Sequence, residues 1–274
     1  MGRKIVGILI LIGILFPSKY SFSQEIEGAA PPAGAEASLS YYGVAQLTKI
    51  RNSGEVCVGM QVGYKPFEFK NEKGEIIGFD VDIAKELAKA LGAELIIKEY
   101  KWEDLTKNLG GEINLIISGM SRTLDRAFYV NFTNPYFQSG QLMIVNEKNI
   151  HLKDPYELNV KGRRIIVVGG TTGEDLANKK FKNAKIISVL NEQEAADKLN
   201  SDKGDAFLFD KPFIEYLGYS YSKWKVLPTQ LTQEAYCFAI PKGDLDFLLW
   251  LNYFIEELKI SGKYKEIYNK WFKY

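Results

Sequence analysis

Histidine and cysteine are scarce in this sequence: 274 residues contain one histidine and two cysteines. His151 lies in a polar segment typical of a surface loop, which argues against histidine-dependent catalysis and against a histidine-rich metal site. Cys57 and Cys237 are 180 residues apart, so they lack the spacing of a metal-binding pair. Both lie in strand-like apolar runs, and they form either one disulfide or two buried thiols. We expect no metal, no cofactor and no catalytic residue.

Long apolar runs are also missing beyond residue 23, where no stretch approaches the roughly 18 apolar residues of a membrane span. The apolar segment 5–16 follows two basic residues and precedes a proline and a small-residue pattern, an order typical of a signal peptide. We predict a signal peptide at 1–23, cleaved near Ser23-Gln24; an uncleaved anchor is the alternative. No cysteine lies near this point, so we expect a soluble periplasmic protein, not a lipoprotein.

Neither sign of charge dominates the chain. It contains 35 basic and 34 acidic residues, and residues 1–23 hold three of the basic and none of the acidic ones. The mature chain therefore has 32 basic and 34 acidic residues, a net charge near −2. This balance favours neither nucleic acid nor an anionic membrane as a partner, so a partner has to be inferred from local sites.

The order of the predicted elements indicates an α/β fold. Residues 24–40 are rich in Ala, Gly, Pro and Glu and predict a flexible linker. Beyond residue 41 strands and helices alternate, and Gly92 ends the first clear amphipathic helix as a C-cap. Strands are predicted at 55–60, 94–98, 115–118, 165–168, 185–189 and 206–209; helices are predicted at 78–91, 102–109, 174–180, 192–199 and 244–272, the last broken at 261–262. This alternation is typical of mainly parallel sheets with crossover helices.

Three segments carry residues suited to a small zwitterion. Residues 118–126 (SGMSRTLDR) place hydroxyl groups and Arg126 after a strand, where a guanidinium can grip a carboxylate; a helix N-cap with the arginine paired to a surface glutamate is the alternative. Residues 167–174 (VVGGTTGE) form a strand, a glycine-rich turn and a helix start; they lack nucleotide-site spacing and suit a lone carboxylate. The apolar strand 205–210 ends in Asp210, which could accept an ammonium group or form a turn.

These segments resemble the type-II periplasmic amino-acid-binding proteins of polar amino-acid ABC transporters. The resemblance runs from about Leu47 to Phe272 and includes ordered matches at 63–69 (GYKPFEF), 78–82 (GFDVD), 118–126, 132–136, 170–172, 205–210 and 264–272. It implies two lobes joined by hinges near 136–140 and 232–236. Lobe 1 would comprise 41–135 and 237–274, and lobe 2 would comprise 141–231.

The resemblance also implies roles for individual residues. Arg126 would clamp the ligand α-carboxylate, helped by the backbone N–H groups of Ser121 and of Thr172, which follows Thr171 in the glycine-rich turn. Asp210, a carbonyl of Ser118 or Gly119 and the Ser121 hydroxyl would hold the α-ammonium group. Tyr64 and Trp102 would be aromatic walls, with ordinary core packing as their alternative role.

The side-chain pocket is less defined by the resemblance. Gln61 stands where many relatives with cationic ligands have Asp, and Val168 and Phe209 stand where some relatives have polar or basic residues. These differences favour a neutral amino acid. Arg122 would favour an acidic ligand if it turned inward, but alternation along the turn predicts that it points away.

The resemblance implies a monomer that delivers a free L-amino acid to an inner-membrane ABC permease, without enzymatic activity. Cyclohexadienyl dehydratases share parts of the same pattern, and Glu234 lies near the strand that would supply their general acid. A ligand-sensing subunit of a membrane receptor is a further alternative, which differs from the transporter only in its partner.

Overall fold

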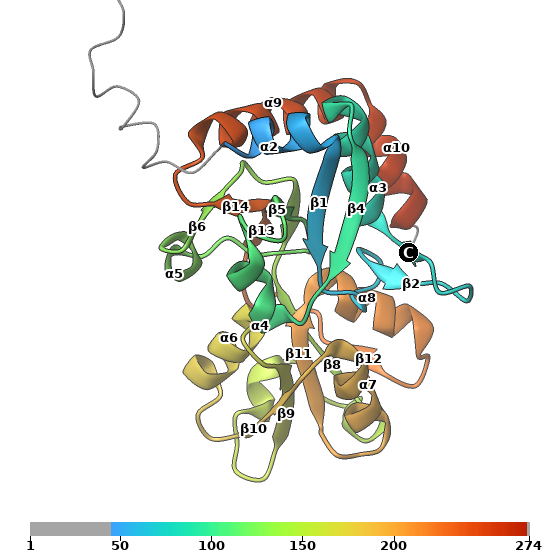
Figure 1. The fold of residues 1–274 in the computed structure, drawn as a ribbon. Helices are drawn as coiled ribbons and strands as arrows, with labels where there is room; N and C mark the ends of the chain where they lie inside the picture. Colours follow the sequence, from blue (N-terminus) through green and yellow to red (C-terminus); the bar gives the residue numbers. More distant parts are fainter. Residues whose placement is uncertain (1–44, 273–274) are drawn as a thin grey trace, which may run out of the picture. The chain divides into compact units, whose positions relative to one another are not determined.

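Two five-stranded sheets organise residues 45–272, the part of the chain that this computed structural model describes. The predicted signal peptide (1–23) and linker (24–40) lie outside the described residues. The strand order is β4-β1-β5-β14-β6 in the first sheet and β10-β9-β11-β8-β12 in the second (Figure 1). The described part of the chain forms a single compact unit.

Three parallel strands form one side of the first sheet, and two further strands extend it through antiparallel pairs. The parallel strands are β1 (Glu55–Met60), β4 (Glu94–Glu99) and β5 (Leu115–Ile116), and the antiparallel ones are β14 (Ala239–Pro241) and β6 (Val130–Phe132). The helices that accompany this sheet are α2 (Gln46–Ser53), α3 (Phe79–Leu91), α4 (Trp102–Leu105), α5 (Leu124–Ala127), α9 (Leu245–Ile260) and α10 (Lys263–Trp271). A small hairpin pairs β2 (Phe69–Lys70) with β3 (Ile76–Ile77).

The second sheet repeats this plan. Its parallel strands are β10 (Lys185–Val189), β9 (Arg164–Val168) and β11 (Ala206–Asp210), and its antiparallel strands are β8 (Gln141–Val145) and β12 (Lys225–Val226). Three helices pack on it: α6 (Thr172–Lys180), α7 (Glu192–Asn200) and α8 (Lys211–Ser220). Short 3₁₀ helices span Thr106–Asn108, Glu147–Asn149 and Pro155–Leu158.

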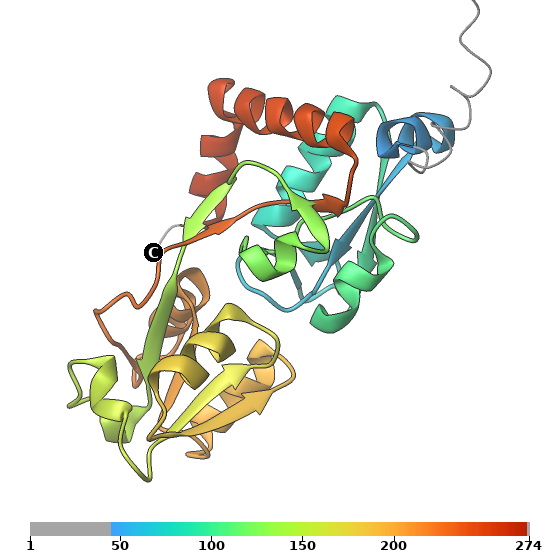
Figure 2. The same cartoon turned by 90° about the vertical axis from the view of Figure 1, so that its left-hand side faces the viewer.

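The chain crosses between the sheets twice, through β7 (Phe137–Ser139) and back through β13 (Glu234–Tyr236). These two strands pair antiparallel, and Figure 2 shows the two connecting segments running side by side. They lie within the ranges 136–140 and 232–236. That they act as a hinge between two lobes stays a prediction.

The second sheet is buried on both faces because its central strands are largely apolar and their successive side chains point to opposite faces. In β9, Ile165 and Val167 join one core cluster, whereas Ile166 and Val168 join the other. Successive side chains of a strand point to opposite faces, so a continuous apolar run supplies both cores at once. Helices on both faces then cover the sheet, as the predicted crossover connections require.

Most helix ends follow local signals, and two predicted elements end early. Gly92 ends α3 in the left-handed conformation (φ 64°), as its sequence predicts. The helix expected at 102–109 stops at Leu105 and continues as a 3₁₀ turn to Asn108, after which Leu109 has an extended backbone (φ −69°, ψ 128°). The strand expected at 115–118 ends at Ile116, since Gly119 adopts φ 52° and turns the chain toward Arg126.

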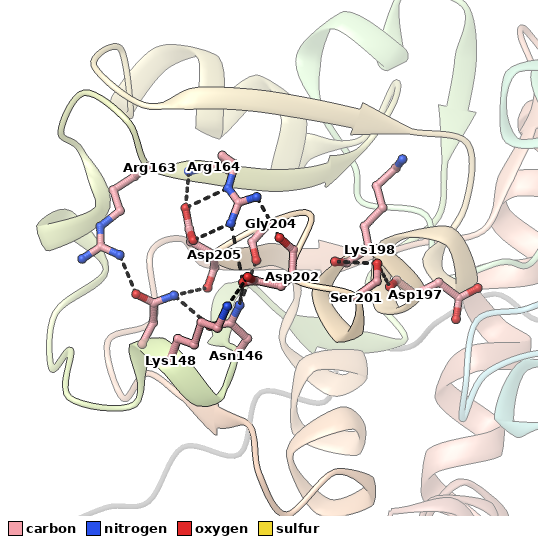
Figure 3. Close-up of polar contacts among 11 residues, drawn as sticks. Asn146, Lys148, Arg163, Arg164, Asp197, Lys198, Ser201, Asp202, Gly204 and Asp205 are labelled. Atoms are coloured by element: carbon pink, nitrogen blue, oxygen red, sulfur yellow. Dashed lines mark hydrogen bonds and ion pairs between the residues drawn. The ribbon is translucent and has the colours of Figure 1, made fainter.

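A polar network holds together the edge of the second sheet where its parallel strands begin. This edge lies opposite the strand ends that carry the predicted site residues. Arg164 opens β9 and pairs with Asp205, which precedes β11, at 3.0 Å from Nη2 to Oδ1 (Figure 3). Asn146, at the end of β8, donates to the Gly204 carbonyl at 3.0 Å. These contacts lock the register of three strands where they meet. No described helix is long and apolar enough to cross a membrane.

Candidate functional site

All eleven residues singled out from the sequence line one cavity between the carboxyl edges of the two sheets. They are Gln61, Tyr64, Trp102, Ser118, Gly119, Ser121, Arg126, Thr171, Thr172, Phe209 and Asp210. Two further residues, Glu68 and Glu192, line it as well. Its free volume is about 20 Å³, room for a single water molecule. A wider groove of about 510 Å³ adjoins the cavity and shares Trp102 and Arg126 with it.

Arg126 reaches the cavity from the short helix α5, whose N-cap Thr123 accepts a hydrogen bond from the Arg126 backbone N–H at 3.1 Å. Its guanidinium donates to the carbonyl of Ser121 at 2.8 Å and across the cleft to the carbonyl of Gly170 at 3.1 Å. The Trp102 ring lies 5.0 Å from the guanidinium carbon, in cation–π contact. Burial lowers the pKa of Arg126, although the nearby Asp210 opposes this effect. A carboxylate in the cavity would offset that desolvation.

The hydroxyl groups of Ser121 and Thr172 converge from the two sheets on one carboxylate. Ser121 Oγ donates to Glu234 Oε2 at 2.6 Å, and Thr172 Oγ1 donates to the same oxygen at 2.8 Å. Thr232 Oγ1 donates to the other oxygen at 2.8 Å. Glu234 on the connecting strand β13 therefore holds both hydroxyl groups in place, and it serves as an acceptor. Thr171 instead caps α6, accepting from the Glu174 N–H at 3.4 Å.

Asp210 ends β11 and is almost fully buried. Its carboxylate accepts hydrogen bonds from Tyr236 and Gln141, and the Tyr64 hydroxyl lies 3.4 Å away. Burial raises the pKa of Asp210 to about 7, and the negative charge of Glu234 adds to the effect. An ammonium group beside Asp210 would stabilise its ionised form and lower that pKa.

Aromatic rings form one wall of the cavity and continue into the core beneath it. The Tyr64 ring stacks on Phe67 with 4.8 Å between centroids and meets Phe209 edge to face at 5.7 Å. Trp102 spans the cleft, since its indole N–H donates to the Gly170 carbonyl at 2.9 Å. Tyr64 therefore has both of the roles considered for it, in the core and at the cavity.

The turn at Ser118 and Gly119 rests on two buried carboxyl groups. Ser118 Oγ donates to Glu68 at 2.6 Å, and the Gly119 N–H donates to Asp80 at 2.8 Å. Burial raises the pKa of Asp80 to about 7 and that of Glu68 well above its ordinary value. One oxygen of each carboxyl group is buried without another hydrogen-bond partner among the described residues. A proton shared between the two groups would satisfy both oxygens.

Sequence reasoning missed Glu68 and Glu192 as lining residues, although signals for both were present. Glu68 belongs to the matched segment 63–69. Glu192 starts α7 directly after β10, at the carboxyl edge where open α/β sheets bind ligands.

Two other expectations can be compared with the structure. Arg122 is exposed, as the alternation along its turn predicts. Cys57 and Cys237 are both free thiols, so of the two alternatives for the cysteines the structure has the thiols and not the disulfide.

Two α/β sheets that meet around a polar cavity at their carboxyl edges are typical of two-lobed binding proteins. Residues 56–274 match the bacterial extracellular solute-binding proteins, family 3, and the chain belongs to this family.

Individual relatives narrow the comparison. The ABC transporter glutamine-binding protein GlnH of Bacillus subtilis (strain 168) is 30% identical over 235 residues, which cover 83% of this chain and 84% of that protein. The crystal structure of the ancestral amino acid-binding protein AncCDT-1, described as a precursor of cyclohexadienyl dehydratase, has a TM-score of 0.79 at 34% identity. It covers 84% of this chain and 100% of its own. A binding component of an ABC transporter from Wolinella succinogenes DSM 1740, complexed with lysine, has a TM-score of 0.77 at 38% identity and covers 80% and 96%.

These relatives agree with the two-lobed α/β fold predicted from the sequence. The curated relatives are binding components of transporters, not enzymes. The dehydratase alternative gains no support from them, and Glu234, its proposed acid, accepts hydrogen bonds from three hydroxyl groups.

Proposed function

We propose that this protein captures a free L-amino acid between its two lobes and delivers it to an ABC permease. The observation that carries the proposal is the convergence of Arg126 and Asp210 on one cavity from different sheets. A guanidinium and a carboxylate held on opposite sides of a small cavity match the two charges of an amino acid. The backbone N–H groups of Ser121 and Thr172 would add donors for the ligand carboxylate, because the hydroxyl groups of both residues already donate to Glu234.

Ligand capture in this scheme requires the lobes to part. The free volume of about 20 Å³ is far smaller than an amino acid, and contacts between the sheets bridge the cleft, such as those of Arg126 and Trp102 with Gly170. Lobe 1 (41–135 and 237–274) would rotate from lobe 2 (141–231) about the segments 136–140 and 232–236. A ligand that contacts both lobes then favours the closed form.

The relatives support an amino acid as the ligand and a transporter as the partner. Their descriptions name glutamine, arginine, histidine and cystine as ligands, and two of them name an ABC transporter. We propose a monomer in the periplasm, exported by a signal peptide at 1–23 and not lipid-anchored. A permease and an ATPase encoded beside the gene would favour the transporter over a sensor subunit.

A thermal-shift screen of the twenty amino acids tests the proposed capture. A ligand present at about 100 times its Kd stabilises the folded state by about 2.7 kcal/mol, which raises Tm by roughly 5 to 10 °C in a protein of this size. At least one amino acid should produce such a shift, and the shift should grow with ligand concentration.

Derivatives of the same amino acid provide the matched controls. Its N-acetyl derivative lacks the ammonium charge and its carboxamide lacks the carboxylate, so neither can engage both Arg126 and Asp210. Both should give much smaller shifts. Equal shifts for the free amino acid and its derivatives would contradict the assigned site.

A further inference from the structure

Glu192 is an acidic group in the cavity that zwitterion recognition does not use. It begins α7 directly after β10, and it is only 4% exposed. Across the cleft it meets Gln61, which follows β1; Gln61 Nε2 lies 3.4 Å from Glu192 Oε2. A neutral amide at that distance is a weak partner for a buried carboxyl group.

A count of charges around the cavity shows what Glu192 lacks. The ionisable side chains among the lining residues, tyrosine aside, are Glu68, Glu192, Asp210 and Arg126. A bound zwitterion would pair its carboxylate with Arg126 and its ammonium with Asp210. Glu68 has the Ser118 hydroxyl, and a proton shared with Asp80 would complete its contacts. Glu192 then remains without a cation.

Burial of this carboxyl group has a measurable consequence. Glu192 lies at the N-terminus of α7, where the positive end of a nine-residue helix favours a negative charge. Burial nevertheless raises the pKa of Glu192 to about 7, so desolvation outweighs the helix. A cation in the cavity would reverse this effect, because it would restore the charged form that burial disfavours.

The position of Glu192 suits the end of a ligand side chain. Arg126 and Thr172, which would bind the ligand carboxylate, lie on α5 and α6, the helices that follow β5 and β9. Gln61 and Glu192 follow β1 and β10, the strands directly beside β5 and β9 in the two sheets. Neighbouring strands lie about 5 Å apart, so Glu192 is placed for a group several Å from the ligand α-carbon.

We propose that Glu192, with Gln61, forms the subsite for the ligand side chain, and that this side chain is cationic. The inference rests on the proposed capture of an amino acid and names the class of its ligand. It replaces the preference for a neutral ligand, which came from Gln61, Val168 and Phe209 and left Glu192 out.

Isothermal calorimetry with isosteric ligands tests the charge requirement. The wild-type protein is titrated with arginine against citrulline, and with lysine against norleucine. Citrulline keeps the shape of arginine without its charge, and norleucine keeps the carbon chain of lysine without its ammonium group. Arginine, lysine or both should bind about 10-fold or more tightly than the neutral counterpart, as a close buried charge pair predicts.

The variant Glu192→Gln keeps the side-chain shape and removes the charge. It should lose about 10-fold or more in affinity for the cationic ligand and change by no more than about 3-fold for the neutral one. Glu215→Gln is the matched control: it makes the same change on α8, at a side chain that is 44% exposed, paired with Lys211 and outside the linings of the cavity and the adjoining groove, and it should preserve the preference.

The outcomes separate this inference from the proposed function. Neutral ligands that bind as tightly as their cationic counterparts would overturn the cationic subsite and leave amino-acid capture intact. Equal losses for both ligands in Glu192→Gln would also overturn it. Failure of every amino acid to bind would overturn the proposed function, and this inference with it. The wild-type comparison needs no variant, so the proposal can be refuted even if Glu192→Gln does not fold.

Discussion

Replacing Arg126 with alanine is the most direct test of how the cavity binds its ligand. The guanidinium is held by the carbonyls of Ser121 and Gly170 at 2.8 and 3.1 Å and by the Trp102 ring. It has five N–H donors, so it can bind a carboxylate in addition to these two carbonyls. Without it, the ligand carboxylate would be buried with no cation. Such a loss costs about 3 to 5 kcal/mol, roughly 100- to 5,000-fold in affinity.

Calorimetry measures this loss directly, with the amino acid that gives the largest thermal shift. Arg126→Lys keeps a charge but not the planar fork, so its affinity should fall between the wild type and Arg126→Ala. Arg122→Ala removes an exposed arginine from the same turn and should bind as the wild type does. If Arg126→Ala retained full affinity, the assignment of the carboxylate to this guanidinium would be refuted.

Two further predictions concern stability. The pKa values of Asp80, Glu192 and Asp210 are raised by burial to about 7, so the folded state takes up protons from pH 7 downward more readily than the unfolded chain. The ligand-free protein should therefore be more stable at pH 5 than at pH 8, with a free energy of unfolding in urea experiments that is higher by at least about 2 kcal/mol. Greater stability at pH 8 would show that these groups ionise freely in the folded protein. Gly119→Ala should lower both stability, by about 1 to 3 kcal/mol, and ligand affinity, because a Cβ there would lie 2.5 Å from the Tyr64 ring. Gly74→Ala imposes a similar positive φ with no atom within 4 Å, so equal losses in the two variants would remove the role assigned to the ring contact.

The elements predicted best were those with an uninterrupted local pattern. The range expected for β1 (55–60) and that for β10 (185–189) match the strands in the structure, and Gly92 ends α3 as expected. Short antiparallel strands such as β6 and β14 were missed, because three residues carry no periodicity and their partners are distant in sequence. The helix α8 was missed as well, since the proline after Lys211 read as a turn although proline is favoured in the first turn of a helix.

Part of the candidate site could likewise be predicted from local sequence patterns. Arg126, Thr172 and Asp210 could be found from the sequence because each follows a strand, and strand ends of one sheet meet at a common edge. Their convergence in one cavity was expected from the resemblance, and the residues do line one cavity. That they bind a ligand there stays a proposal.

The sequence by itself determined the longer strands and helices, their alternation and the strand-end motifs, because periodicity, caps and turns depend on residues a few positions apart. Only the tertiary structure decided which carboxyl groups face the cavity and which partners they have. Gln61 and Glu192 are 131 residues apart, and Ser121 and Glu234 are 113 apart. Burial and charge at such sites arise from chain segments that meet only on folding, and no local pattern encodes them.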